Sequence, residues 1–144
     1  MLVARLNRNK LRLLSQSRLD EAGVLLDKQL WTGAYYMTGL AVECALKAYL
    51  AQAVQQHDLP DKSFINRIHT HKLKELAQLD VTLWTELENE IKTDVKLRTN
   101  WNTVLLWNDE NRYEVVDELQ ATSLYAATTE ERTGVMEWIR RRWQ

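Results

Sequence analysis

The chain has 144 residues and a formal net charge of -1, and 45% of its residues are hydrophobic while 27% are charged. This length is typical of one domain with an ordinary core, so we expect residues 1–144 to form a single domain. Because the net charge is close to zero, binding to nucleic acid or an anionic membrane would need a local basic patch. One Pro and four Gly leave few residues for the turns of a sheet, and the composition therefore favours long helices.

Cysteine usage and the N-terminal residues bear on the compartment. Cys44 is the single cysteine of the sequence, which excludes an intramolecular disulfide framework and is typical of a reducing compartment. Residues 1–9 carry charges where a signal peptide needs an unbroken apolar run, and no segment has the roughly 18 consecutive apolar residues of a membrane span. We therefore expect a cytoplasmic protein that does not associate with a membrane.

Two long helices are expected in the first part of the chain. Apolar residues between Leu11 and Leu30 recur at helical spacing, with charged residues on the other side, and predict an amphipathic helix. The segment from Trp31 to Gln56 is apolar almost all round, which is typical of a helix in the middle of a bundle. Pro60 then interrupts the pattern, so we expect a loop there with a short helical turn over 64–68.

Shorter elements are expected in the second part. Thr70 is the expected N-cap of a short helix over 71–79, and Asp80 that of a longer fourth helix. The predicted stripe of the fourth helix consists of Trp84, Leu87, Ile91, Val95, Arg98, Asn102 and Leu105. Turn formers over 107–113 indicate a structured loop, and residues 115–143 predict a last helix, or two joined near Thr128. These elements predict an all-α, up-and-down bundle of four or five helices.

Two charged residues lie inside the otherwise apolar second helix. Glu43 and Lys47 are four residues apart, with Glu nearer the N-terminus, which is the better orientation for an ion pair on one helix. Buried charges need partners, so the two side chains form either a structural pair, which an Arg from another helix could join, or part of a polar site.

His69 and His71 raise the question of a metal site. Residues two apart on a helix point in nearly opposite directions, and the sequence has no cluster of Cys or carboxylate residues with ligand spacing. We therefore expect no metal and no cofactor, with His71 packing or hydrogen-bonding to a neighbour in the first turn of its helix.

Aromatic and basic residues come together near the end of the fourth helix. Trp101, Trp107, Arg112 and Tyr113 are groups that stack on bases and bind phosphates. In the alternative reading, the tryptophans close one end of the bundle and Arg112 folds back onto a carboxylate. Walker loops, dinucleotide fingerprints and nucleophile elbows are absent from the sequence.

Three pieces of the sequence resemble the HEPN superfamily of small prokaryotic helical domains. They are Tyr36-Met-Thr-Gly-Leu-Ala-Val-Glu-Cys-Ala-Leu-Lys-Ala48, then His71-Lys-Leu73, and finally Trp101 through Trp107 to Arg112-Tyr113. The resemblance covers residues 10–143. It implies a helical bundle that is commonly a homodimer, with roles in toxin–antitoxin pairs, phage defence or nucleotide handling, often beside a nucleotidyltransferase partner.

Many members of this superfamily are metal-independent ribonucleases, whose signature is Arg followed after four to six residues by His. This sequence lacks the signature, because the positions that follow Arg98 at that distance are Thr103, Val104 and Leu105. The ribonucleases need the imidazole for proton transfer and the guanidinium to stabilise phosphate charge. The simplest hypothesis is therefore a non-catalytic member of the superfamily.

Three functional hypotheses follow. The first is a binding module that presents six residues to a nucleotide, RNA or a partner protein: Lys47, Arg98, Trp101, Trp107, Arg112 and Tyr113. The second is a ribonuclease with an unconventional site, in which Glu43, His71 or Tyr113 replaces the usual base near Arg112. The third is a purely structural helical interaction protein whose polar groups all pair internally.

Overall fold

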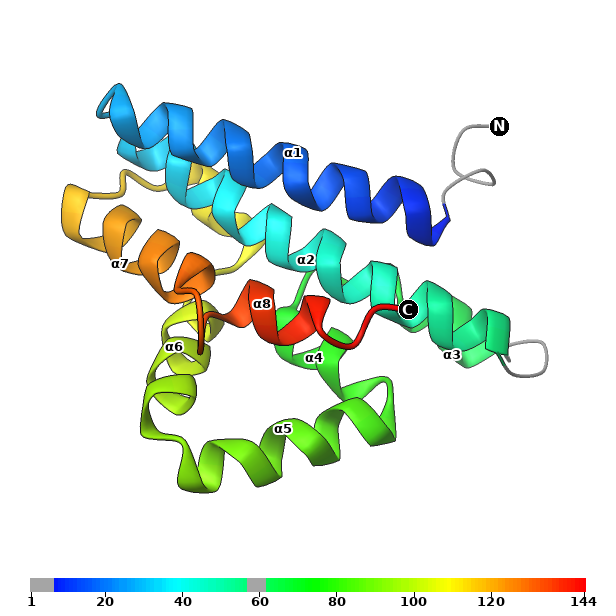
Figure 1. The fold of residues 1–144 in the computed structure, drawn as a ribbon. Helices are drawn as coiled ribbons and strands as arrows, with labels where there is room; N and C mark the ends of the chain where they lie inside the picture. The colour runs from blue at the N-terminus through cyan, green and yellow to red at the C-terminus, as the bar shows by residue number, and fades with distance from the viewer. Residues whose placement is uncertain (1–6, 57–61) are drawn as a thin grey trace.

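The computed structural model describes residues 7–56 and 62–144, apart from the side chains of residues 55, 56 and 112. Within these residues the chain is all-α and contains no strand. Two long helices, α1 (Arg8–Asp27) and α2 (Trp31–Gln56), run antiparallel and lie side by side (Figure 1). The other elements are α3 (Lys62–Arg67), α4 (Leu73–Gln78), α5 (Val81–Thr93), α6 (Val95–Leu105), the 3₁₀ helix η2 (Asp109–Tyr113), α7 (Glu118–Thr129) and α8 (Val135–Arg140).

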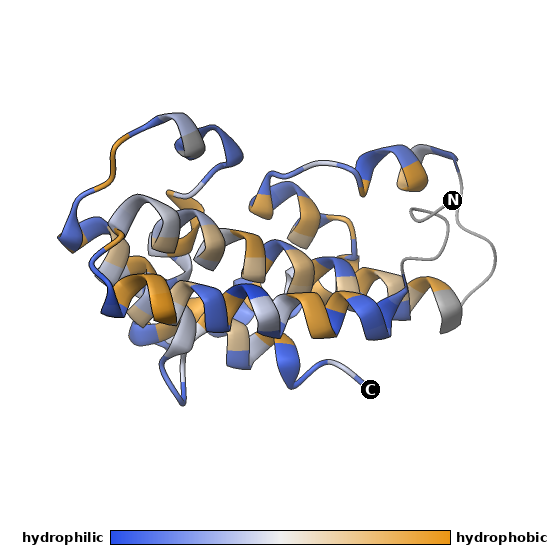
Figure 2. Cartoon of the chain, turned by 90° about the horizontal axis from the view of Figure 1, so that it is seen from above, coloured by the Kyte–Doolittle hydropathy of each residue, from blue (hydrophilic) through white to orange (hydrophobic). Residues whose placement is uncertain are grey.

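Helix α2 is the centre of the bundle, as its sequence predicts. It packs against α1, α4, α7, α8 and η2. Its alanines are fully buried at positions 34, 41, 45 and 48, so neighbouring helices approach its backbone closely. The surrounding helices carry both hydrophobic and hydrophilic residues (Figure 2).

The turn between α1 and α2 is a Schellman motif. The backbone N–H of Leu30 donates to the carbonyl of Leu25, and that of Gln29 donates to Leu26, each over 2.9 Å. These two bonds require a left-handed residue after the helix. Gln29 takes that conformation, with φ of 61°, at a position where Gly is usual.

The short helices after α2 begin and end where side chains cap them. The carboxylate of Asp80 accepts a hydrogen bond from the backbone N–H of Leu83 over 2.8 Å, which confirms the predicted N-cap of α5. Helix α4 begins two residues later than expected, because the hydroxyl of Thr70 accepts from the backbone N–H of Lys72 instead of capping a helix. Residues 57–61, which include Pro60 of the expected loop, lie outside the described residues.

The expected fourth helix is in fact two helices, α5 and α6, which meet at Asp94. This residue has an extended backbone, and its carboxylate accepts from the backbone N–H of Leu97 over 3.0 Å, so it ends α5 and caps α6. The break changes the direction in which the following side chains point. Leu97, Trp101 and Val104 are buried in α6, while Val95 and Asn102 of the predicted stripe are exposed.

The remaining segments give more elements than the four or five helices that the sequence predicts. The expected loop over 107–113 contains η2, and Asn108 and Asn111 cap it reciprocally. Of the two alternatives predicted for residues 115–143, the structure has the second: two helices, α7 and α8, separated by residues 130–134. The described residues therefore contain eight α-helices, of which α3, α4 and α8 have six residues each.

Candidate functional site

One face of α2 carries most of the residues that the sequence analysis singled out. Tyr36, Gly39, Glu43 and Lys47 are spaced by three or four residues, so they form one stripe along the helix. Trp107 packs against this stripe at Gly39, where an added Cβ would overlap the indole ring, and its ring lies 6.0 Å from that of Tyr36. The stripe and its partners form the first candidate site.

Glu43 is the centre of the polar part of this stripe. Its carboxylate is buried, with 8% of the side chain exposed, and Oε2 lies 3.1 Å from Nζ of Lys47. Nδ1 of His71 lies 3.0 Å from Oε2 and 3.1 Å from Oε1 of Glu43. An ionised carboxylate only accepts hydrogen bonds, so Nδ1 of His71 is the donor. The predicted pair of Glu43 and Lys47 is present, and its third member is His71 instead of an Arg. His71 lies in the connection before α4 and not, as expected, in the first turn of a helix.

The contact with Glu43 gives His71 a fixed orientation. With Nδ1 turned toward the buried carboxylate and 53% of the side chain exposed, Nε2 is the ring nitrogen left for solvent or a ligand. A carboxylate that orients a histidine in this way is part of many acid–base sites. The neighbouring thiol is not activated, because burial and, next, the charge of Glu43 raise the pKa of Cys44.

The two tryptophans expected to stack on a ligand lie in the core. Trp101 and Trp107 are each 3% exposed, and both belong to the main cluster of buried side chains. The expected stacking surface is therefore replaced by packing, because Trp101 follows the phase that Asp94 sets for α6 and Trp107 lies on Gly39. The alternative reading, in which the tryptophans close the bundle, matches their burial.

The remaining predicted site residues do not gather around one cleft. Nη1 of Arg98 donates to the backbone carbonyl of Ile91 over 3.0 Å, so Arg98 joins α6 to the end of α5. Tyr113 is 80% exposed at the end of η2. The side chain of Arg112 lies outside the described residues.

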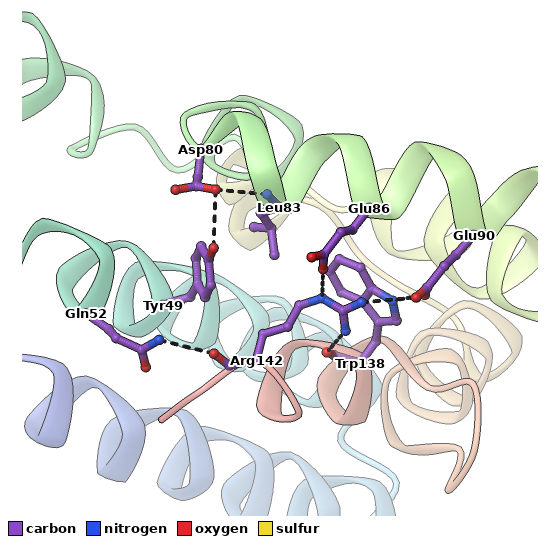
Figure 3. Close-up of polar contacts among 8 residues, drawn as sticks. All are labelled: Tyr49, Gln52, Asp80, Leu83, Glu86, Glu90, Trp138 and Arg142. Carbon is purple, nitrogen blue, oxygen red and sulfur yellow. Dashed lines mark hydrogen bonds and ion pairs between the residues drawn. The ribbon is translucent and has the colours of Figure 1, made fainter. Parts of the chain in front are cut away.

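A second polar cluster holds the C-terminal segment against α5 (Figure 3). Nε of Arg142 lies 2.7 Å from Oε2 of Glu86, and Nη2 lies 3.1 Å from Oε1 of Glu90. The guanidinium also lies over the ring of Trp138, 3.6 Å from its centroid. Trp138 in turn donates its indole N–H to Glu90. Because these groups already satisfy one another, the cluster is a structural clamp.

The same cluster includes a tyrosine with a perturbed hydroxyl. The hydroxyl of Tyr49 donates to Oδ1 of Asp80 over 3.2 Å, on the carboxylate that caps α5. Burial, followed by the negative charge of Asp80, raises the pKa of Tyr49 to about 12.

A groove between α6, η2 and α7, lined by both apolar and polar side chains, is the second candidate site. It encloses about 570 Å³, and buried Tyr35 and Leu124 line it together with Leu106 and Leu119. Leu106 and Leu119 are each 73% exposed, and Val115, on the connection between η2 and α7, is 96% exposed. Exposed apolar residues that gather beside a groove mark an interaction site more often than isolated ones do.

The sequence analysis missed this groove, although two local signals for it exist. Residues 104–107 are four consecutive apolar residues. Because consecutive residues at a helix end point in different directions, they cannot all be buried against the core. Leu119 follows directly after the first residue of α7, where the first turn faces solvent.

The segment that forms most of the groove is acidic. Residues 106–124 contain five carboxylates and one arginine. The carboxylate residues are Asp109, Glu110, Glu114, Asp117 and Glu118. Glu114 lines the groove itself, and its negative charge, after burial, is the second cause that raises the pKa of Tyr35 on the floor.

The structure and the comparisons with known proteins add three findings. No three His, Cys, Asp or Glu residues among 7–56 and 62–144 come close enough together to hold a metal ion. No helix in that part of the chain is both long and apolar enough to cross a membrane. Comparisons with protein families, with curated protein sequences and with solved structures gave no match to this chain.

Proposed function

We propose that this chain is a HEPN-like helical module that binds another protein through the groove between α6, η2 and α7. The observation that carries the proposal is the exposed pair Leu106 and Leu119 on the walls of a groove of about 570 Å³. Burying such side chains in a partner removes apolar surface from water, which is the main driving force of association.

The HEPN assignment rests on the resemblance of the sequence, and the face of α2 is compatible with it. All three resembling pieces meet there, at the contacts of Gly39 with Trp107 and of Glu43 with His71. As parts of the same proposal, the chain is cytoplasmic, forms a homodimer and serves a toxin–antitoxin, defence or nucleotidyltransferase-associated system, and the nucleotidyltransferase is the first partner to test.

A protein partner is favoured over RNA or a nucleotide. The indoles of Trp101 and Trp107 are buried, so they offer no face for base stacking. The five carboxylates around the groove repel phosphate. At the C-terminal end, Arg142 is already paired with Glu86 and Glu90.

The test is differential capture followed by reconstitution. The tagged chain, a Leu106→Gln/Leu119→Gln variant and a control Leu13→Gln/Val24→Gln variant are used to capture proteins from the cells that encode the chain. Leu13 and Val24 are also large, exposed apolar residues, but they lie on α1. We expect a partner that the chain and the control retain and the groove variant loses, and that binds the purified chain in titration calorimetry. Equal retention by both variants would show that the groove is not the contact surface.

A specific observation also favours a ribonuclease as a second candidate. The buried carboxylate of Glu43 holds His71 with Nε2 toward solvent, as a general base requires. Cleavage of a fluorescent single-stranded RNA pool, with a chelator present, should then be lost in His71→Ala and Arg112→Ala and retained in His69→Ala, a control in which another exposed histidine is removed. Absence of cleavage by the unmodified chain would eliminate this candidate.

A further inference from the structure

Several polar groups on the rim of the groove are already used within the chain. The side chains of Asn108 and Asn111 cap η2, Gln120 forms a reciprocal cap with Asp117, and the hydroxyl of Thr103 donates to the carbonyl of Thr99. These bonds fix the shape of the rim before any partner binds. They use the amide oxygens of Asn108, Asn111 and Gln120, which are then less available to accept from the backbone N–H groups of an incoming segment.

This occupancy restricts the conformation of the occupant. An extended segment would place unpaired N–H and C=O groups against the buried side chains of Tyr35 and Leu124 on the floor, which is costly. The described residues contain no strand whose edge could pair with such a segment. A helix satisfies its own backbone and places only side chains in the groove.

The carboxylates around the groove restrict the charge of the occupant. Glu110, Glu114 and Glu118 are exposed, and no ion pair joins them to any side chain that the structure describes. The amide of Asn111 donates to Oε2 of Glu114 over 3.1 Å. Cationic side chains that flank an apolar face would therefore meet complementary charge on the rim.

We infer that the segment of the partner protein that docks in this groove is a cationic amphipathic helix. Its apolar face lies between Leu106 and Leu119, and its Lys or Arg residues lie against Glu110, Glu114 and Glu118. This inference rests on the proposed protein-binding function and adds the chemistry of the partner to it.

The test uses two designed helical peptides of about five turns. One carries Leu at positions i, i+3, i+4 and i+7 with Lys on the remaining face, and the other has every Lys replaced by Glu. Binding of each labelled peptide to the full chain is measured by fluorescence anisotropy at low and at high salt. We expect the cationic peptide to bind at least about tenfold more tightly than the acidic one, and its affinity to fall with salt because exposed charges are screened.

Matched variants separate docking in the groove from adsorption to an acidic surface. The variant Glu110→Gln/Glu114→Gln/Glu118→Gln should weaken the cationic peptide, while the control Asp20→Asn/Glu88→Gln/Glu131→Gln, with the same change in net charge on other exposed residues, should not. The variant Leu106→Gln/Leu119→Gln should weaken it as well. Equal effects of the two charge variants, or no effect of the leucine variant, would overturn the inference.

The outcomes also distinguish this inference from the proposed function. Tighter binding of the acidic peptide, lost in the leucine variant, would overturn the cationic helix and leave the groove as a protein-binding surface. Absence of binding by both peptides, together with a captured partner that depends on Leu106 and Leu119, would do the same. A capture experiment in which no partner depends on Leu106 and Leu119 would, in contrast, overturn the proposed protein-binding function itself.

Discussion

The indole of Trp107 lies against Gly39, in the space that a side chain at residue 39 would occupy. Trp107 comes from the segment between α6 and η2, and Gly39 is in the middle of the central helix α2. The contact joins two parts of the chain that are distant in sequence, and it packs a large aromatic side chain directly against the backbone of α2.

Gly39→Ala should therefore destabilise the fold, although Ala is a better helix former than Gly. We expect a loss of about 1–3 kcal/mol from overpacking, against a gain of up to about 1 kcal/mol from helix propensity. Urea unfolding followed by circular dichroism measures the difference. Gly33→Ala is the control on the same helix, because its new Cβ would meet only the flexible side chain of Leu25. Equal stability of the two variants would contradict the packing of Trp107.

Gln29→Gly should stabilise the protein. Gln29 has a left-handed backbone in the turn between α1 and α2, which costs a residue with a side chain about 1 kcal/mol relative to Gly. The thermal unfolding midpoint should rise, whereas Lys28→Gly, at the preceding position with φ of -91°, should lower it. If Gln29→Gly lowers the midpoint as well, the turn does not have this conformation in solution.

Removal of Glu43 should cost more stability than removal of His71. Glu43 is buried and bonds both Lys47 and His71, while His71 is half exposed and can exchange its contact for water. We expect a loss of about 2 kcal/mol for Glu43→Ala and less than about 1 kcal/mol for His71→Ala. A double-mutant cycle in chemical denaturation measures the coupling of the two residues, and a coupling of zero would show that the contact contributes nothing.

Loss of Arg142 should release the C-terminal segment from α5. Its guanidinium joins Glu86, Glu90 and the ring of Trp138, so we expect Arg142→Ala to destabilise the fold by about 1–3 kcal/mol. Hydrogen exchange of the amides in α5 should increase, and Arg142→Lys should recover part of the loss. Arg132→Ala, at an exposed residue, is the control. Equal protection of the α5 amides from exchange in Arg142→Ala and Arg132→Ala would show that Arg142 does not hold the C-terminal segment against α5.

Stability should fall at alkaline pH through Tyr49. Its pKa is raised to about 12 in the folded chain, so the neutral hydroxyl is favoured by folding. The contribution is complete below the ordinary pKa of tyrosine, near 10, and is lost as the pH rises through the folded pKa. Denaturant unfolding measured across this range should show a smaller fall for Tyr49→Phe than for the unmodified chain. An identical fall would assign the effect to other groups.

The sequence by itself determined the features that depend on neighbouring residues. The bounds of α2 are those predicted, Asp80 caps α5, and Glu43 pairs with Lys47 one turn later. Each of these features involves groups within four residues of one another, so the local pattern contains all the information needed. The break at Asp94, with its cap on Leu97, is also local, but the sequence predicts one helix there because an apolar stripe continues through it.

Only the tertiary structure decided which side chains meet and which remain exposed. His71 reaches Glu43 and Trp107 reaches Gly39 because α4 and the segment before η2 fold onto one face of α2, and no spacing in the sequence encodes that approach. The same folding buries Trp101 and leaves Leu106 and Leu119 on a groove. Helix formation is governed by local hydrogen bonds, whereas burial depends on how whole helices pack against one another.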